Sequence, residues 1–284
     1  MRIGLSTPMV MQLPGVSSSW EEVAGVADLA TVAHTADELG FDHLTCAEHI
    51  AVPVGDGGQR GLTYWDPLST FGFLAAHTSR IRLTTSVIVL GYHHPLEIAK
   101  RFGTLDRLSA GRLVLGVGVG SLAEEFDLLG AAFDGRGERA DDAIAAVRAA
   151  LSTTRPAYHG SHYQFEGFAV QPCAVQPRVP IWVGGRTLRS LRRAVRLADG
   201  WMPFGLRTTE IASMLGKVDA PSGFDVVLPT GGALDPTADR SGSTKRLNAL
   251  HAAGATAVTC SVAAESPGHY CDQLAALREL ADQL

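Results

Sequence analysis

Glycines occupy alternate positions where an apolar stretch of the chain gives way to a polar one. The segment from Leu113 to Glu125 reads LVLGVGVGSLAEE and places Gly116, Gly118 and Gly120 along one face of a predicted strand end. Because glycine has no side chain, the backbone here can closely approach a flat ring or a phosphate. Plain strand bends and close helix packings use the same spacing, so both interpretations stay open.

A carboxylate and an imidazole are adjacent at Glu48 and His49, directly after an apolar run. A carboxylate beside an imidazole can set its tautomer and tune its proton affinity. We therefore take His49 as a candidate general acid or base and Glu48 as its catalytic partner. The structural alternative is a histidine that bonds a neighbouring carbonyl and holds the loop leading to Pro53.

The strongest candidate for anion binding is the sequence Gly184, Gly185, Arg186 and Thr187, which precedes a predicted helix. Free backbone N–H groups at a helix N-terminus, the positive end of the helix dipole and a nearby guanidinium all favour a phosphate. The alternative is a glycine pair that only turns a strand tightly into a helix.

Two adjacent histidines, His93 and His94, invite a metal interpretation, because with His43 and His49 they would form a histidine-rich mouth. Pro95 fits a helix entry instead, with the preceding residue held extended. No HExxH motif or other carboxylate-bearing ligand pattern accompanies these histidines. We therefore predict no metal site.

Short β-rich runs alternate with longer amphipathic runs along the whole chain, which is typical of a parallel α/β domain. The predicted strands are Arg2–Thr7, His43–Ala47, Ile81–Ile88, Arg112–Gly116, Ile181–Val183, Gly200–Met202, Asp225–Leu228 and Ala257–Val262. The clearest predicted helices are Ala27–Leu39, Pro67–His77, Pro95–Leu108, Arg139–Leu151, Leu188–Leu197, Thr244–Ala253 and Cys271–Leu284. Eight strand-helix units in ~250 or more residues indicate a closed (β/α)8 barrel with its site at the strand C-terminal ends. An open doubly wound sheet is the alternative.

One segment breaks this alternation between the fourth helix and the fifth strand of the predicted barrel. Residues 158–176 carry aromatic residues at short spacing without a helical period, which predicts a short β excursion. It would either cover the mouth or pack on the barrel wall. The Gly- and Pro-rich stretch 229–242 is predicted as a loop, and residues 1–284 as one domain.

Composition and charge exclude several classes of protein. Hydrophobic residues make up 46% of the chain and charged residues 19%, while the net charge of −5 argues against a broad nucleic-acid footprint. No window approaches the ~18 consecutive apolar residues of a membrane span. The N-terminal MRIGLSTP predicts a strand rather than a signal peptide, and the four cysteines lack CxxC spacing, so we expect a cytoplasmic protein.

Longer stretches of the chain resemble the luciferase-like monooxygenase superfamily, particularly its actinobacterial deazaflavin-dependent branch. The segments that carry the resemblance are CAEHIAVP at 46–53, the run from TTSVIVLGYHH to EEFDLLG at 84–130, the YHG to FEG excursion, and PIWVGGRTLRSLRRAVRLADGWMP at 180–203. The resemblance implies a (β/α)8 barrel that holds a flavin-type ring at its C-terminal mouth. The cofactor would be coenzyme F420, an 8-hydroxy-5-deazaflavin, or alternatively FMN.

The resemblance also implies roles for individual residues. A non-proline cis peptide between Ser86 and Val87 would support the ring, and Glu124 and Glu125 would be helix N-terminal carboxylates rather than catalytic acids. Sugar-phosphate dehydrogenases of this branch have an acidic residue where this chain has Ser121, which disfavours glucose 6-phosphate as substrate. The implied cofactor-binding residues are Ala47, Ser86, Val87, Gly118, Gly120, Ser121, Gly184, Gly185, Arg186 and Thr187.

We therefore expect an oxidoreductase that transfers a hydride between F420 and a small organic substrate. The first alternative is an FMN-dependent monooxygenase served by a separate flavin reductase, which needs a dry apolar pocket. The second is a non-catalytic flavin-binding protein, and the third is a barrel of another superfamily such as a metal-dependent hydrolase. A homodimer formed through barrel helices is compatible with the F420-dependent enzyme and with both flavin-binding alternatives.

Overall fold

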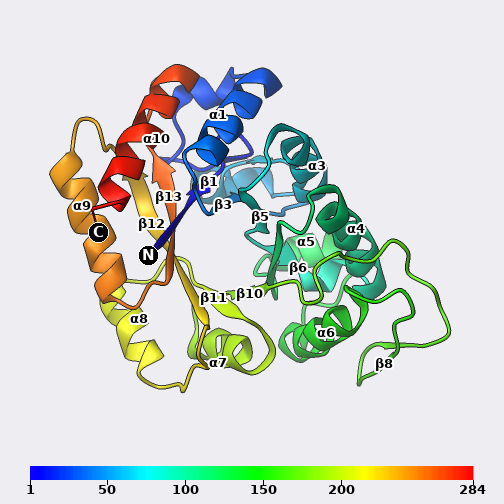
Figure 1. Cartoon of the computed structure of the whole chain (residues 1–284). Coiled ribbons are helices and arrows are strands. Elements are labelled where there is room, and N and C mark those ends of the chain that lie inside the picture. Colours follow the sequence, from blue (N-terminus) through cyan, green and yellow to red (C-terminus); the bar gives the residue numbers. More distant parts are fainter. Residues whose placement is uncertain (284) are drawn as a thin grey trace.

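Parallel strands form a closed ring in the computed structural model, which describes residues 1–283 (Figure 1). Neighbouring strands pair in sequence order, and β10 pairs with both β7 and β11, so the ring has no open edge. The ring consists of β1 (Arg2–Ser6), β3 (His43–Cys46), β5 (Arg82–Thr85), β7 (Leu113–Gly118), β10 (Ile181–Gly184), β11 (Gly200–Met202), β12 (Asp225–Leu234) and β13 (Ala257–Val262). This arrangement confirms the predicted (β/α)8 barrel and excludes the open sheet.

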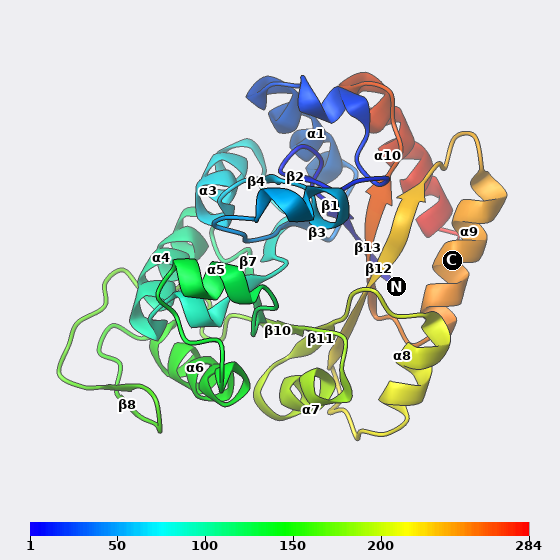
Figure 2. The same ribbon diagram turned by 180° about the vertical axis from the view of Figure 1, so that it is seen from behind.

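Helices surround the ring, as both views show (Figures 1 and 2). They are α1 (Val26–Glu38), α3 (Pro67–His77), α4 (Pro95–Leu108), α6 (Arg136–Ala150), α7 (Leu188–Leu197), α8 (Thr208–Leu215), α9 (Arg240–Ala252) and α10 (Pro267–Ala281). Short turns α2 (Gly57–Arg60) and α5 (Ala123–Leu128), the 3-10 turns η1 (Ser19–Glu22), η2 (Val54–Asp56) and η3 (Leu90–Tyr92), and the strands β2 (Met11–Gln12), β4 (Thr63–Tyr64) and β6 (Ile88–Val89) complete the connections. Figure 2 views the barrel from the side on which α5 and the β2–β4 pair lie.

Local sequence explains where these elements begin. Helix α3 starts with Pro67 directly after Asp66, whose carboxylate accepts the Ser69 N–H at 2.7 Å. Helix α10 repeats this pattern with Ser266 and Pro267. Strand β7 is buried at every residue, as expected for a parallel strand covered by helices outside and filled by side chains inside.

Several predicted element boundaries need correction. Helix α8 was absent from the prediction, and α9 and α10 begin four residues earlier than expected. The stretch 229–242 is not one loop, because β12 continues to Leu234 after a register shift between Pro229 and Ala233. The predicted strand 81–88 divides into β5 and β6 on either side of Ser86 and Val87.

The predicted β excursion is an antiparallel hairpin of β8 (Tyr158–His159) and β9 (Gln164–Phe165). It lies outside the ring near α6 in both views (Figures 1 and 2). Asp142 of α6 holds the hairpin by accepting hydrogen bonds from the Tyr158 hydroxyl at 2.6 Å and the His162 N–H at 2.7 Å. The segment therefore packs on the barrel wall rather than over the mouth.

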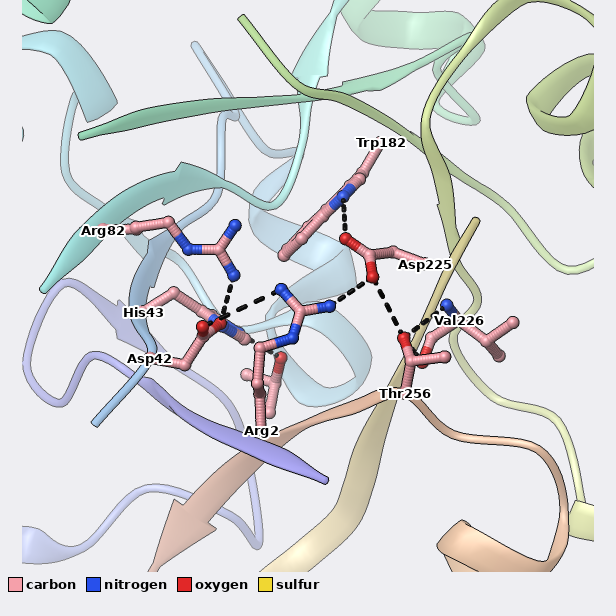
Figure 3. A network of polar contacts seen from close by, with 9 residues as sticks. Arg2, Asp42, His43, Arg82, Trp182, Asp225, Val226 and Thr256 are labelled. Atoms are coloured by element: carbon pink, nitrogen blue, oxygen red, sulfur yellow. Dashed lines mark hydrogen bonds and ion pairs between the residues drawn. The ribbon is translucent and has the colours of Figure 1, made fainter. Parts of the chain in front are cut away.

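Charged side chains close the barrel where the strands begin (Figure 3). Arg2 pairs with Asp225, and Arg82 pairs with Asp42. His43 is fully buried beside them, with Nδ1 2.7 Å from Asp42 Oδ2 and Nε2 2.9 Å from Thr259 Oγ1. The prediction of His43 at a histidine-rich mouth is therefore wrong, because this residue opens β3 and the mouth lies at the other end of the strand.

A small apolar cluster fills the ring above the charged side chains. It contains Val114, Trp182, Met202, Val227 and Ala257. The partly buried side chain of Val87 packs against this cluster from the C-terminal ends of the strands. Val87 therefore lies between the interior cluster and the mouth of the barrel.

Candidate functional site

The glycines at the ends of β7 and β10 make room for Val87. A Cβ atom at Gly118 would lie 2.6 Å from Val87 Cγ2, and one at Gly184 would lie 2.8 Å from Val87 Cγ1. At Gly120, where φ is +77°, a Cβ atom would meet the Phe126 ring at 2.4 Å. Protein side chains therefore fill the Cβ side of these glycines, and contact of a ligand ring with the glycine backbone stays a prediction.

Val87 offers the partly exposed surface at this point of the mouth. The peptide bond between Ser86 and Val87 is cis, as the sequence resemblance led us to expect. Ser86 donates its N–H to the Cys46 carbonyl at 2.7 Å, and Glu48 donates its N–H to the Val87 carbonyl at 3.3 Å. Ala47 lies between these contacts, so the ends of β3 and β5 are joined on both sides of it.

His49 pairs with a carboxylate that the sequence analysis assigned to another role. Its Nδ1 lies 2.7 Å from Glu125 Oε2, and the His49 ring packs edge-on against Tyr64 at 4.6 Å between centroids. The Glu125 carboxylate is fully buried and also accepts hydrogen bonds from the Tyr92 hydroxyl at 2.8 Å and the Ala51 N–H at 3.1 Å. Although burial favours protonation, these donors hold the pKa of Glu125 below its usual range.

These contacts fix the tautomer of His49. The acceptor at Nδ1 keeps the proton on that nitrogen, and within residues 1–283 no protein group is hydrogen-bonded to Nε2. His49 is partly exposed at the barrel rim, with 18% of its side chain accessible to solvent. Glu125 and Tyr92 were missed as site residues, although the tyrosine after a buried strand and the acidic helix start were visible in the sequence.

Glu48 does not touch His49. Its Oε1 lies 2.8 Å from Nε2 of His93, and its Oε2 accepts the Val89 N–H at 2.7 Å. Successive residues of an extended backbone point in opposite directions, so Glu48 turns into the protein where His49 turns toward α5. The predicted partnership of Glu48 with His49 is therefore wrong.

The segment Gly184–Thr187 leads directly into α7. Thr187 and Ser190 cap the helix reciprocally, each side-chain oxygen lying 3.2 Å from the backbone nitrogen of the other residue. Gly185 has a φ of +127°, which L side chains rarely adopt, while Arg186 and Thr187 are exposed. Because this cap uses the Thr187 and Ser190 N–H groups, the Leu188 and Arg189 N–H groups are the ones of the first turn that can face an anion.

Ser121 and the remaining histidines contribute less. The Ser121 side chain is exposed, with its hydroxyl 3.5 Å from Arg60 Nη1. His94 is exposed and accepts the Leu96 N–H at the start of α4. Within the described residues, no group of three or more His, Cys, Asp or Glu side chains is arranged to hold a metal ion. No helix in that part of the chain has the length and apolar character needed to cross a membrane.

Comparison with known proteins shows the family to which this barrel belongs. A sequence model described as luciferase-like monooxygenase matches residues 1–239. The chain belongs to the luciferase-like monooxygenase family. This family membership makes the chain an oxidoreductase of the luciferase-like type.

Among its relatives, an uncharacterized protein of Mycobacterium tuberculosis is 32% identical over 199 residues, which cover 66% of this chain and 68% of that protein. An F420-dependent glucose-6-phosphate dehydrogenase of Nakamurella multipartita is 31% identical over 192 residues, which cover 66% of this chain and 55% of that enzyme. The crystal structure of monooxygenase RslO1 from Streptomyces bottropensis superposes with a TM-score of 0.74 at 22% identity, over 100% of this chain and 99% of that one. The last similarity supports the fold alone.

Proposed function

We propose that this protein transfers a hydride between coenzyme F420 and a small organic substrate. The observation that carries the proposal is the His49–Glu125 pair at the C-terminal rim, in which Nε2 of the imidazole has no partner among residues 1–283. Similarity to an F420-dependent enzyme at 31% identity supports the choice of cofactor. A substrate other than glucose 6-phosphate is favoured, because Ser121 replaces the acidic residue expected in sugar-phosphate dehydrogenases of this branch.

The residues at the mouth fit such a cofactor. Val87 presents an apolar surface for one face of a flat ring. The interior cluster packs against Val87 from the other side and keeps its side chain in place. Gly185, Arg186 and the first turn of α7 supply N–H donors and positive charge for a phosphate. When bound, the deazaflavin supplies a carbon centre that accepts or donates a hydride.

His49 would complete the reaction by moving the accompanying proton. In the direction of substrate oxidation, Nε2 takes the proton of an alcohol while the buried Glu125 carboxylate stabilises the resulting imidazolium. In the direction of reduction, the imidazolium returns a proton to the substrate atom beside the one that receives the hydride. Tyr92 and the backbone N–H groups hold Glu125, so the histidine keeps its orientation in both directions.

A second candidate function is an FMN-dependent monooxygenase, and the family description, luciferase-like monooxygenase, favours it. That function would need a flavin reductase as partner and a site that excludes water. The two candidates differ in reactivity with oxygen, because the ring carbon that replaces nitrogen makes reduced deazaflavin a poor oxygen reactant.

Parallel binding titrations with F420 and FMN test the proposal. We expect F420 to bind more tightly, and reduced F420 to be consumed with an enone, imine or ketone but not with oxygen alone. A preference for FMN together with oxygen uptake would favour the monooxygenase. Binding of neither compound would contradict both candidates.

The phosphate assignment has a matched pair of variants at one position. Gly185→Asp and Gly185→Asn impose the same strain at φ +127°, but only the aspartate carries a negative charge. We expect Gly185→Asp to weaken F420 binding about tenfold more than Gly185→Asn, a difference of about 1.4 kcal/mol. Equal affinities of the two variants would show that no phosphate lies at this helix start.

A further inference from the structure

The position of Val87 depends on a segment that reaches it from another strand. Ser86 donates to Cys46, the Val87 carbonyl accepts from the Glu48 N–H, and the Val89 N–H donates to Glu48 Oε2 at 2.7 Å. Two of these three contacts involve Glu48. Glu48 therefore holds the backbone from the Val87 carbonyl to the Val89 N–H, and its side chain makes the second of these contacts.

Glu48 itself depends on one basic side chain. Only 4% of its side chain is exposed, and within residues 1–283 His93 is the one basic group within 4.0 Å of its carboxylate, at 2.8 Å. Breaking a buried ion pair by removal of one partner leaves an uncompensated charge and is strongly destabilising. Without His93, Glu48 would either take up a proton or turn toward water, and in both cases its hold on Val89 would weaken.

Given the function proposed above, we propose that Glu48 and His93 are a positioning pair that fixes Val87 beneath the bound cofactor ring. Neither residue exchanges a proton with the substrate. His93 holds the Glu48 carboxylate, Glu48 holds the backbone at Val87 and Val89, and Val87 supports the ring. This assignment replaces the acid-base role expected for Glu48 and gives a role to His93, which the sequence analysis interpreted as part of a helix entry.

Charged groups around His93 favour its protonated form. Burial lowers the pKa of His93, but the hydrogen bond and charge of Glu48 and the charge of Glu97, whose Oε1 lies 3.7 Å from Nδ1, raise it above its ordinary value, against a smaller opposing effect of Arg101. His93 is therefore charged below this pKa and loses its charge as pH rises through it. Tyr92 faces His93 with its ring and holds no charge at these pH values.

Hydrogen exchange at the Val89 amide tests the proposal in protein without cofactor. We compare protein labelled with ¹⁵N-valine in the wild type, His93→Ala, His93→Gln and the control His94→Gln, whose neighbouring histidine does not contact Glu48. We expect the protection factor of Val89 to fall about tenfold in His93→Ala, remain near wild type in His94→Gln, and be intermediate in His93→Gln. Protection in the wild type should decrease as pH rises through the pKa of His93, whereas His93→Gln should show no such decrease.

Cofactor binding and turnover then separate positioning from catalysis. We expect His93→Ala to weaken F420 binding about tenfold while kcat at saturating cofactor stays within about twofold of wild type, because a misplaced support mainly lowers the population of the bound geometry. Unchanged Val89 protection in a folded His93→Ala protein would overturn the proposal, and so would a large loss of kcat with unchanged affinity. If the wild type binds no flavin, the proposed function fails, but the exchange measurement still decides whether His93 holds this segment.

Discussion

A histidine paired with a carboxylate lies at each end of the barrel, and the two pairs differ in what surrounds them. At the N-terminal end, His43 is completely buried, and its ring nitrogens face Asp42 and Thr259 (Figure 3). At the C-terminal rim, His49 is partly exposed, and only Nδ1 has a protein partner in the described chain. The same two chemical groups therefore form a sealed structural contact in one place and a partly exposed pair, for which we propose proton exchange, in the other.

The pKa values of His43 and Asp42 fit a sealed contact at the N-terminal end. Burial and the nearby charges of Arg82 and Arg2 lower the pKa of His43, although Asp42 opposes them, so this ring stays neutral. Despite the opposing effect of burial, the His43 hydrogen bond and the Arg82 charge hold the pKa of Asp42 well below its usual range. A histidine becomes available for chemistry when the protein leaves one of its nitrogens unsatisfied.

The largest effect on stability is expected at Gly4, which lies against the buried His43 ring of the His43–Asp42 pair. A Cβ atom at Gly4 would lie 2.3 Å from the His43 ring, which is enclosed on every side. We expect Gly4→Ala to lower the free energy of unfolding by ~3 kcal/mol or more, as measured by denaturant titration. The same exchange at Gly72 within α3, where a Cβ atom meets nothing within 4 Å, should not destabilise the protein. Equal stabilities of the two variants would show that the N-terminal end can repack.

Replacement of the rim histidine should affect turnover rather than stability. We expect His49→Ala to lower kcat about 100-fold, because general acid-base catalysis is lost, while F420 affinity changes little. The fall in melting temperature should be small, because the Tyr92 hydroxyl and the Ala51 N–H still bond the buried Glu125 carboxylate. His43→Gln should give the opposite result, with lower stability and a normal kcat for the folded fraction. Full turnover by His49→Ala would remove the functional distinction between the two ends.

The smallest effect concerns acid stability. A carboxylate with a lowered pKa contributes stability above its unfolded pKa, and this contribution is lost as pH falls through the folded value. Asp42 and Glu125 both belong to this class, with the greater lowering at Asp42. We expect the free energy of unfolding to fall below about pH 4, and to fall less steeply in Asp42→Asn than in Glu125→Gln. Urea titrations at several pH values measure these slopes, and a steeper fall in Asp42→Asn would reverse the assignment.

Sequence periodicity was sufficient to predict the barrel, because strand and helix patterns are local. Each barrel strand was predicted near its observed position, and the cis bond at Ser86 was expected from resemblance. Helix α8 was missed, although Ile211, Met214 and Leu215 have helical spacing. The hairpin at 158–176 was predicted, but its location was not, because that depends on Asp142 in another element.

The partners within the site were not predictable from the sequence. Glu125 stands 76 residues from His49, and only the closed ring brings the ends of β3 and β7 to the same rim. Adjacency favoured Glu48 instead, although that side chain points the other way. The glycines gave a correct signal of close approach, but the sequence does not state that the Val87 side chain makes that approach at Gly118 and Gly184.

Because Val87 packs against the interior apolar cluster, substitutions in that cluster can change the position of Val87 at the mouth. Val114, Met202 and Val227 are buried side chains of the cluster against which the valine packs. A smaller side chain at one of these positions would let Val87 move inward and deepen the mouth, and a larger side chain would push Val87 outward. The rim residues would stay unchanged in both cases. Evolution, or a designed library, can therefore reshape the substrate site through substitutions that never appear on the surface.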